Sequence, residues 1–156
     1  MAGNLDDSDV QYLSTLQTLK SLDMESATVA QGLFGAPFKG FDRLAVCVLP
    51  RSLTQIGSET FKNCSALKSI TLPVSLQTTG TDLLVGCGAL TDIYVPSSSP
   101  DCVSTGAFGG TPDAAAVTVH VHQGLADVLK RSHKCSSFSH FLHHLPTLPH
   151  HFNNNT

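Results

Sequence analysis

A set of six positions, most of them apolar, recurs at a constant interval in the middle of this chain, and this repetition constrains the fold more than any other feature. The clearest copy begins at Phe61 and ends at Pro73. The three copies place these residues at equivalent positions: Phe38, Phe41, Leu44, Cys47, Leu49 and Pro50; Phe61, Cys64, Leu67, Ile70, Leu72 and Pro73; Leu84, Cys87, Leu90, Ile93, Val95 and Pro96. A period in the twenties is typical of a solenoid, in which each copy forms one coil that stacks on its neighbours.

Each copy is expected to contain one short β-strand. The apolar spacing changes from three residues to two at Ile70 and Leu72, and two-residue spacing indicates a strand with one face buried. Pro73 then ends the strand, because proline has no N–H to donate to a neighbouring strand. One coil buries too few side chains to fold alone, so several coils must stack.

The stretch Gly57–Pro73 resembles the repeat unit of the BspA-like leucine-rich repeat family, which reads approximately Ile-Gly-x-x-Ala-Phe-x-x-Cys-x-x-Leu-x-x-Ile-x-Ile-Pro. Ile56 also fits the start of that unit, and the resemblance covers about residues 33–131. It implies a right-handed solenoid that acts in adhesion or protein binding without catalytic residues. We therefore predict an α/β solenoid, a short right-handed stack of about four 23-residue repeats with helical caps at both ends.

We expect four segments along the chain. They are an N-terminal cap helix and lead-in over residues 1–32, the leucine-rich-repeat solenoid over 33–122, a C-terminal cap helix over 123–135, and a His-rich, partly disordered tail over 136–156. Caps are expected because the open ends of a solenoid must be covered for the protein to stay soluble.

Helical patterns flank the repeats. Ser8–Gln11 has the form of a capping box and lies among apolar residues at three-residue spacing, so a cap helix is predicted from there to about Met24. A short dimerisation helix is the alternative, although strict three-residue spacing makes a poor coiled-coil seam. At the other end of the repeats, Leu125, Val128 and Leu129 are spaced to form the docking face of a helix.

The chain carries few charges. Charged residues make up 13% of its 156 residues and the formal net charge is −3, which argues against a nucleic-acid partner because such proteins usually present a basic face. No run of 18 apolar residues occurs, so no membrane span is predicted. The polar, acidic start of the chain lacks the features of a secretory signal. A cytoplasmic location is therefore expected, with the cell surface or secretion as the alternative if a signal peptide is missing from this sequence.

Neither an enzymatic activity nor a cofactor is expected. The sequence contains no nucleophile elbow, no phosphate-binding glycine loop and no His-Glu-x-x-His motif, and its carboxylates are scattered. A Cys–His hydrolase would need a thiol outside the core, for which only Cys102 and Cys135 qualify. The repeat cysteines Cys47, Cys64 and Cys87 are expected to be buried free thiols, because stacked side chains that point the same way do not readily form a disulfide.

The histidines suggest a second kind of site. His120 and His122 are predicted to lie on the exposed side of the last strand of the solenoid. The tail adds His140, His143, His144, His150 and His151. Clustered imidazoles suit zinc, copper or nickel, and a pH-sensitive contact is a further option because histidine titrates near neutrality. The simpler interpretation is that the strand histidines are merely exposed and that the tail docks partly through its aromatic residues.

The predicted function is a non-catalytic protein–protein interaction module that binds a protein partner through the exposed strand face of the solenoid. Outward-facing residues are expected to form two columns: Val48, Thr71, Tyr94 and Thr118 in one, and Val46, Ser69, Asp92 and Ala116 in the other. Tyr94 is the only aromatic residue there, and aromatic residues are favoured interface anchors. Tyr94 and Asp92 are therefore predicted to lie at the centre of a weak, uncharged protein-binding patch.

Two alternative functions stay open on the sequence alone. The first is a secreted or cell-surface adhesin or antigen, for which the Asn-x-Ser/Thr patterns at Asn63 and Asn154 would be glycosylation sites. The second, which is less favoured, is a metal-binding protein that uses the C-terminal histidines. The sequence specifies neither the identity of the partner nor the oligomeric state.

Overall fold

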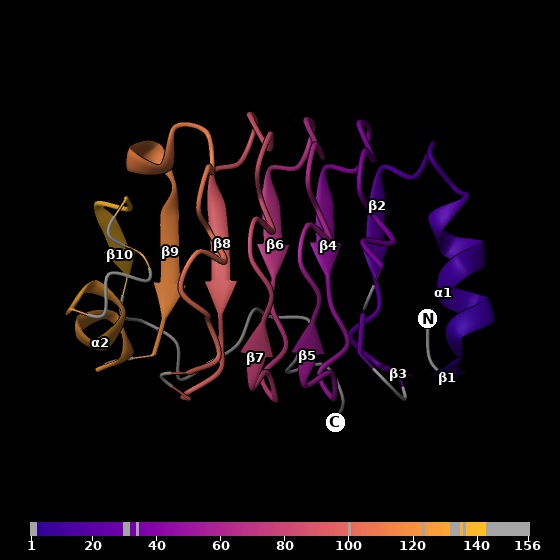
Figure 1. Cartoon of the computed structure of the whole chain (residues 1–156), viewed down its shortest axis with the longest axis horizontal. Helices are drawn as coiled ribbons and strands as arrows, with labels where there is room; N and C mark the ends of the chain where they lie inside the picture. Colours follow the sequence, from indigo (N-terminus) through magenta and orange to yellow (C-terminus); the bar gives the residue numbers. More distant parts are fainter. Residues whose placement is uncertain are drawn as a thin grey trace, which may run out of the picture.

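One parallel β-sheet runs the length of the molecule (Figure 1). The structure, a computed structural model, describes residues 3–29, 32–33, 35–99, 101–122, 124–131, 135 and 137–142. The strands of this sheet are β2 (Ser21–Asp23), β4 (Val46–Val48), β6 (Ser69–Thr71), β8 (Asp92–Val95), β9 (Thr118–Val121) and β10 (His140–Leu142). They lie in the spatial order β10-β9-β8-β6-β4-β2, and every neighbouring pair is parallel. The chain therefore makes one coil between each strand and the next.

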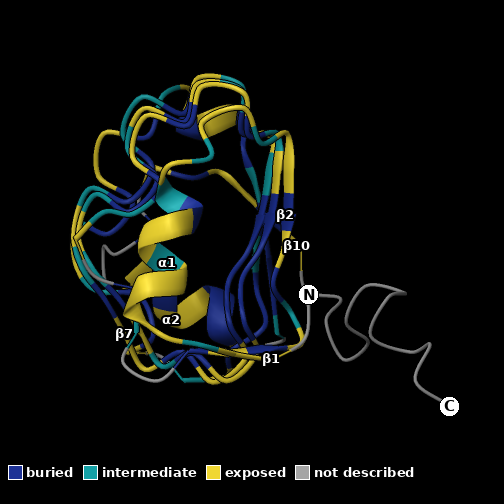
Figure 2. Cartoon of the chain, turned by 90° about the vertical axis from the view of Figure 1, so that its right-hand side faces the viewer, coloured by how far each residue is buried: buried dark blue, intermediate teal, exposed yellow. Residues whose placement is uncertain are grey.

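Shorter elements complete the coils and cover their ends. Two further parallel pairs join β1 (Gly3–Leu5) to β3 (Ala27–Val29) and β5 (Gln55–Ile56) to β7 (Thr78–Thr79). The helices are α1 (Asp7–Ser14), the 3-10 helix η1 (Ala114–Ala116) and α2 (Leu125–Arg131). Seen along the stack, β2 and β10 lie on one side of the coil and β7 on another (Figure 2). Figures 1 and 2 together place α1 across one end of the stack and α2 across the other.

The core consists of equivalent residues stacked from coil to coil. The inward residue at the middle of each strand is buried, and these residues are Leu22, Cys47, Ile70, Ile93, Val119 and Phe141. Phe38 and Phe61, which occupy the same position in consecutive repeats, stack with their ring centroids 5.6 Å apart, and Leu84 in the next coil is also buried. This vertical alignment confirms the predicted solenoid.

The stack is longer than the four repeats expected from the sequence. The two strands that the repeat pattern missed are β2 and β10, one at each end of the sheet. They were missed because their intervals are irregular: β2 pairs Leu22 with Cys47 across a longer interval than that of the central repeats, and β10 pairs Phe141 with Val119 across a shorter one.

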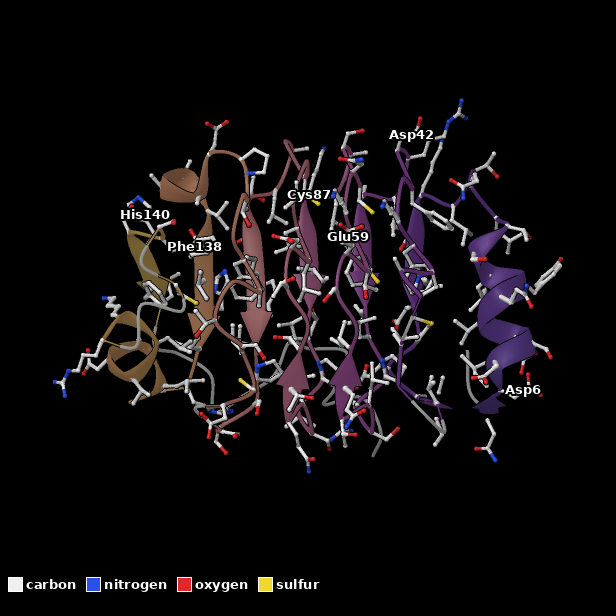
Figure 3. The ribbon with its side chains drawn as sticks, viewed as in Figure 1. Asp6, Asp42, Glu59, Cys87, Phe138 and His140 are labelled. Carbon is white, nitrogen blue, oxygen red and sulfur yellow. The ribbon has the colours of Figure 1, made fainter. Side chains whose placement is uncertain are left out.

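At the C-terminal end, Figure 3 shows Phe138 and His140 at the opposite end of the molecule from Asp6.

The predicted N-terminal helix is wrong in its start and in its end. The N-cap is Asp6 rather than Ser8: the Asp6 carboxylate accepts hydrogen bonds from the main-chain N–H groups of Ser8 and Asp9, and the Asp9 carboxylate accepts one from the Asp6 N–H. The helix ends at Ser14 rather than near Met24. Three-residue spacing drifts around a helix of 3.6 residues per turn, and here it belongs to the first coil instead.

The first coil reproduces the repeat pattern with a longer interval. Its inward residues are Leu13, Leu16, Leu19, Leu22 and Met24, and the same interval separates each of them from its counterpart in the next coil. Those counterparts are Phe38, Phe41, Leu44, Cys47 and Leu49. Helix α1 therefore provides the first inward residue of a coil as well as the cover over its open side.

The C-terminal elements differ in two details from the expectation. In α2, Leu125 and Leu129 are buried as predicted, but Val128 is 43% exposed, and Ala126 is buried instead. Beyond α2, Phe138 and Phe141 are buried, so these two aromatic residues of the predicted tail dock onto the solenoid and form its last coil. His143, His144, His150 and His151 lie outside the described residues.

The repeat cysteines are buried thiols, as predicted. The Cys64 thiol donates to the carbonyl oxygen of Phe38, and the Cys87 thiol donates to that of Phe61, each over 3.1 Å. The hydrogen bond with Cys87, together with burial, raises the pKa of Cys64. Both thiols are fully buried, so they serve as small polar links between successive coils and are out of reach of a substrate.

Candidate functional site: the outer face of the sheet

The residues that flank each inward strand residue point away from the core and form two columns on the outer face of the sheet. Strand register defines both columns. The first outer column contains Ser21, Val46, Ser69, Asp92, Thr118 and His140; the second contains Asp23, Val48, Thr71, Tyr94, His120 and Leu142. Each column crosses all six strands, so side chains far apart in the sequence lie side by side on a flat strip.

Most of the predicted site residues lie where the sequence placed them. Val46, Ser69 and Asp92 are neighbours in the first outer column, and Val48, Thr71 and Tyr94 are neighbours in the second. The strands that hold them follow one another at the regular interval of the central repeats, which is why the sequence alone aligned them correctly.

The predicted continuation of both columns into β9 is wrong. Thr118 pairs with Asp92 rather than with Tyr94, and His120 is the residue beside Tyr94. Ala116 lies in η1, outside the sheet. The interval from Asp92 to Thr118 is longer than the regular one, because the turn-rich segment after β8 contains more additional residues than the sequence comparison allowed. In each column the β9 residue therefore lies two positions later in the sequence than predicted. His120 takes the place predicted for Thr118 and so enters the site.

His120 connects two coils through Asp92. Its Nε2 lies 2.7 Å from Oδ1 of Asp92, and its ring stacks on Tyr94 with centroids 4.2 Å apart and planes 10° from parallel. The other carboxylate oxygen of Asp92 accepts a hydrogen bond from the Thr91 hydroxyl over 2.7 Å. We call these three residues, Asp92, Tyr94 and His120, the outer-face cluster. Burial and the nearby Asp92 carboxylate raise the pKa of the Tyr94 phenol.

The two outer columns differ in how much surface they offer. In the first column Val46 is 39% exposed, and the Asp92 side chain is 34% exposed. In the second column, Val48, Thr71 and His120 are buried, while Tyr94 is half-buried with one ring face against His120. The Asp92 carboxylate is therefore accessible at the outer face, whereas the His120 side chain is not. His120, Val48 and Thr71 were all expected to be exposed, and for these three residues the expectation is wrong. Tyr94 and Asp92 pack against His120.

The described residues do not assemble a metal site or an exposed thiol. Within that part of the chain, no three His, Cys, Asp or Glu side chains are grouped so that they could hold a metal ion. Cys102 and Cys135, which were the two candidates for an accessible nucleophile, are both buried. The metal hypothesis for the remaining tail histidines concerns residues outside the described range.

None of the helices in the described part of the chain has the length and apolar character needed to cross a bilayer. The α-helices α1 and α2 contain eight and seven residues.

The comparison with protein families supports the resemblance seen in the sequence. Residues 36–140, which are more than half of the chain, match the BspA type leucine-rich repeat region in six copies. No curated protein and no solved structure matches the chain significantly. The family match therefore carries the comparison, and it covers β4 to the start of β10.

Proposed function

Because the chain belongs to the BspA-type leucine-rich repeat family, we propose that it is a non-catalytic interaction module that binds a protein partner through the outer face of its sheet. Leucine-rich repeat domains generally mediate protein binding, and the family is typically non-catalytic. The proposal adds to these general properties a particular surface, namely the two outer columns, and a centre for that surface at Tyr94 and Asp92.

The observation that carries this proposal is the continuity of the outer face. Adjacent parallel strands lie about 4.8 Å apart, so six strands present a strip roughly 24 Å wide. The strip is fixed by main-chain hydrogen bonds between coils and by the stacked core below it. A partner that binds there meets a surface that is already ordered, which lowers the entropy cost of association.

The centre of the strip has the composition of an interface anchor. Tyr94 is the only phenylalanine, tyrosine or tryptophan in the two outer columns, and it belongs to the third strand from the C-terminal end of the sheet. Tyrosine contributes a large contact area and a polar tip, and it is enriched among the residues that dominate binding energy. Its column neighbours are Thr71 and His120, and small polar residues, Ser69 and Thr118, flank Asp92 in the other column, which suits a flat contact of moderate affinity.

The proposal is tested by capturing the native partner and then blocking the face. The full chain is immobilised, partners from native cells are identified by mass spectrometry, and each candidate is purified for direct binding. Ser69→Arg places a large side chain in the middle of the first outer column, and Ser52→Arg makes the same change in an exposed turn outside the sheet. We expect Ser69→Arg to weaken binding at least tenfold and Ser52→Arg to leave it unchanged. Equal affinities for the two variants would assign binding to another surface.

The role of Tyr94 needs its own variant. Tyr94→Ala removes the aromatic ring, and we expect a loss of binding of about tenfold or more, since an aromatic anchor contributes about 2 kcal/mol. If affinity for the captured partner is unchanged, Tyr94 is not the centre of the contact, although Ser69→Arg still decides whether the outer face is used.

A further inference from the structure

The outer face has a charge pattern that the proposed function does not explain. The two outer columns contain two carboxylates, Asp23 and Asp92, but neither column contains a lysine or an arginine. Lys20 and Lys68 lie just before β2 and β6, outside both columns. A face with carboxylates and no cations of its own attracts a basic partner and repels an acidic one.

Asp92 retains the capacity to bind another donor. Its oxygens accept hydrogen bonds from His120 and Thr91, each at 2.7 Å. An ionised carboxylate has about four acceptor positions, so these two bonds leave roughly half of them unused. One third of the side chain is exposed, and a ligand at the outer face can therefore reach it.

Tyr94 stands beside this carboxylate on the same face of the same strand. The two residues are separated by one inward residue, Ile93, so their side chains emerge next to each other. A lysine ammonium or an arginine guanidinium gains energy both from a carboxylate and from an adjacent aromatic ring. Arginine suits the pair particularly well, because its planar group stacks on rings while its N–H groups reach a carboxylate.

We propose that Asp92 and Tyr94 bind a basic side chain, arginine or lysine, of the protein partner, and that His120 competes for the same carboxylate when it is protonated. This inference rests on the proposed function, since it names the chemistry of the partner at the proposed face. It also adds a direction of regulation: acidification weakens binding, because a cationic His120 neutralises the charge that holds the partner.

The surroundings of His120 define the groups on which this competition depends. From β8, Asp92 and Tyr94 contact it directly. On its own strand Thr118 precedes it by two residues and His122 follows it by two, while Leu142 and His140 lie opposite on β10. Asp92 is therefore the only carboxylate among these neighbours. The competition is therefore tested by comparing binding at neutral and mildly acidic pH.

A minimal probe tests the site without knowledge of the partner. N-acetyl-arginine amide is titrated into the isotope-labelled full chain, and N-acetyl-citrulline amide, which has nearly the same shape but no charge, is the control. We expect NMR signals of Asp92 and Tyr94 to shift with the arginine probe at pH 7.5 and to shift much less with citrulline. Equal shifts with both probes, or shifts centred elsewhere on the chain, would overturn the proposal.

Matched variants separate a specific site from general charge attraction. Asp92→Asn should weaken the arginine probe about tenfold, the size expected for a charge-assisted hydrogen bond. Asp23→Asn removes the other carboxylate of the face, which has no aromatic neighbour in its column, and should leave the affinity unchanged. If the two variants lose affinity equally, the face attracts cations without a defined site. Tyr94→Leu should also weaken binding of the arginine probe. If Asp92→Asn does not fold, this variant decides whether the probe binds at the proposed site.

The competition by His120 is tested by pH. The wild-type chain should bind the arginine probe several-fold more weakly at pH 5.5 than at pH 7.5, and His120→Gln should bind it equally at both. A wild-type affinity that is independent of pH, or a variant that keeps the full pH dependence, contradicts the competition. Failure of these experiments leaves the proposed function intact if Ser69→Arg still blocks the captured partner, whereas failure of Ser69→Arg removes the proposed face itself.

Discussion

At the scale of single residues, the distance between coils is set by close main-chain contacts that allow no side chain. At Gly80, the main-chain N–H donates to the carbonyl oxygen of Ile56 over 2.7 Å. A Cβ atom built on Gly80 would collide with the main-chain nitrogen of Ser58 and lie 2.6 Å from its Cα. Backbone atoms cannot move aside as a flexible side chain can, so glycine is required at this position.

Replacement of Gly80 tests this requirement. We expect Gly80→Ala to destabilise the protein by about 1–3 kcal/mol, because the added methyl group forces two coils apart. Gly88→Ala is the matched control, since a Cβ at Gly88 meets no atom within 4 Å. Urea unfolding of both variants measures the difference, and similar midpoints for the two would show that the coils tolerate the separation.

A second residue-scale feature is an ion-pair cluster between two coils. Glu59 lies at a main-chain φ of 60°, a left-handed turn conformation, and its carboxylate contacts Lys39 over 2.6 Å and Lys62 over 2.8 Å. Hydrogen bonds from Lys39 and then Lys62 lower the pKa of Glu59 from 4.5 to about 2. The same contact with Glu59 raises the pKa of Lys62.

These shifts predict how stability changes in acid. Because the pKa of Glu59 is lower in the folded state, its contribution to stability is present above about pH 4.5 and is lost as the pH falls towards about 2. We expect the difference in unfolding free energy between the wild type and Glu59→Gln to shrink over this interval. The contribution is small, because the three side chains are partly exposed to solvent. A difference that stays constant from pH 6 to pH 2 would exclude a role for Glu59 ionisation.

Residue-level prediction from sequence succeeded in the middle of the chain and failed where the interval changed. The positions of Val46, Ser69 and Asp92 follow from the constant interval of the central repeats. The neighbour of Tyr94 on β9 was misplaced, because the length of a loop does not determine the strand register that follows it. Register is set by burial of Val119 and Val121, and a shift by two residues keeps the same face buried.

At the scale of elements, the two ends of the stack are coils with a helix in place of one side. Cys135, Phe138 and Phe141 occur at three-residue steps and are all buried, which reproduces the spacing of Cys64, Leu67 and Ile70 in the central repeat. The sequence contained this signal, but the surrounding histidines and prolines obscured it. Leu16, Leu19 and Leu22 keep the same spacing, but the capping motif that precedes them favours a helix. End coils are hard to predict because their inward residues alone keep the repeat pattern.

The last coil is anchored by buried aromatic residues, and this leads to a prediction for β10. Phe138 packs edge-on against Phe108 with centroids 5.7 Å apart, and it is one of two aromatic residues that hold the coil in place. We expect Phe138→Ala to release β10, since loss of a buried phenylalanine costs about 3–5 kcal/mol. Hydrogen exchange should increase at Phe141 and Leu142 and stay slow in β6.

The control for this variant is Val128→Ala in α2. Val128 is 43% exposed, so its loss should leave exchange in β10 unchanged. If Phe138→Ala instead speeds exchange uniformly over all strands, the last coil does not open separately from the rest of the solenoid.

At the scale of the whole molecule, each described strand of the long sheet pairs with the strands of the coils beside it. Stability in such a stack is approximately a sum of terms for individual coils and for the interfaces between neighbours. The central coils are therefore coupled to both sides, while the end coils are coupled to one. A partner that spans several strands of the proposed face would stabilise several of these interfaces together.

A central substitution should divide the stack into two weakly coupled parts. Phe61 is fully buried and stacks on Phe38, so Phe61→Ala removes contacts within its own coil and with its neighbour. We expect the free energy of unfolding to fall by about 3–5 kcal/mol, which is a large part of the total stability of a typical domain.

Urea unfolding followed by circular dichroism should change from one steep transition to a broad or two-step transition. Val74→Ala, at a residue that is 37% exposed, should change the free energy of unfolding by less than about 0.5 kcal/mol and keep the transition steep. A Phe61→Ala protein that still unfolds in one equally steep step would mean that the coils are coupled over a longer range than nearest-neighbour contact provides.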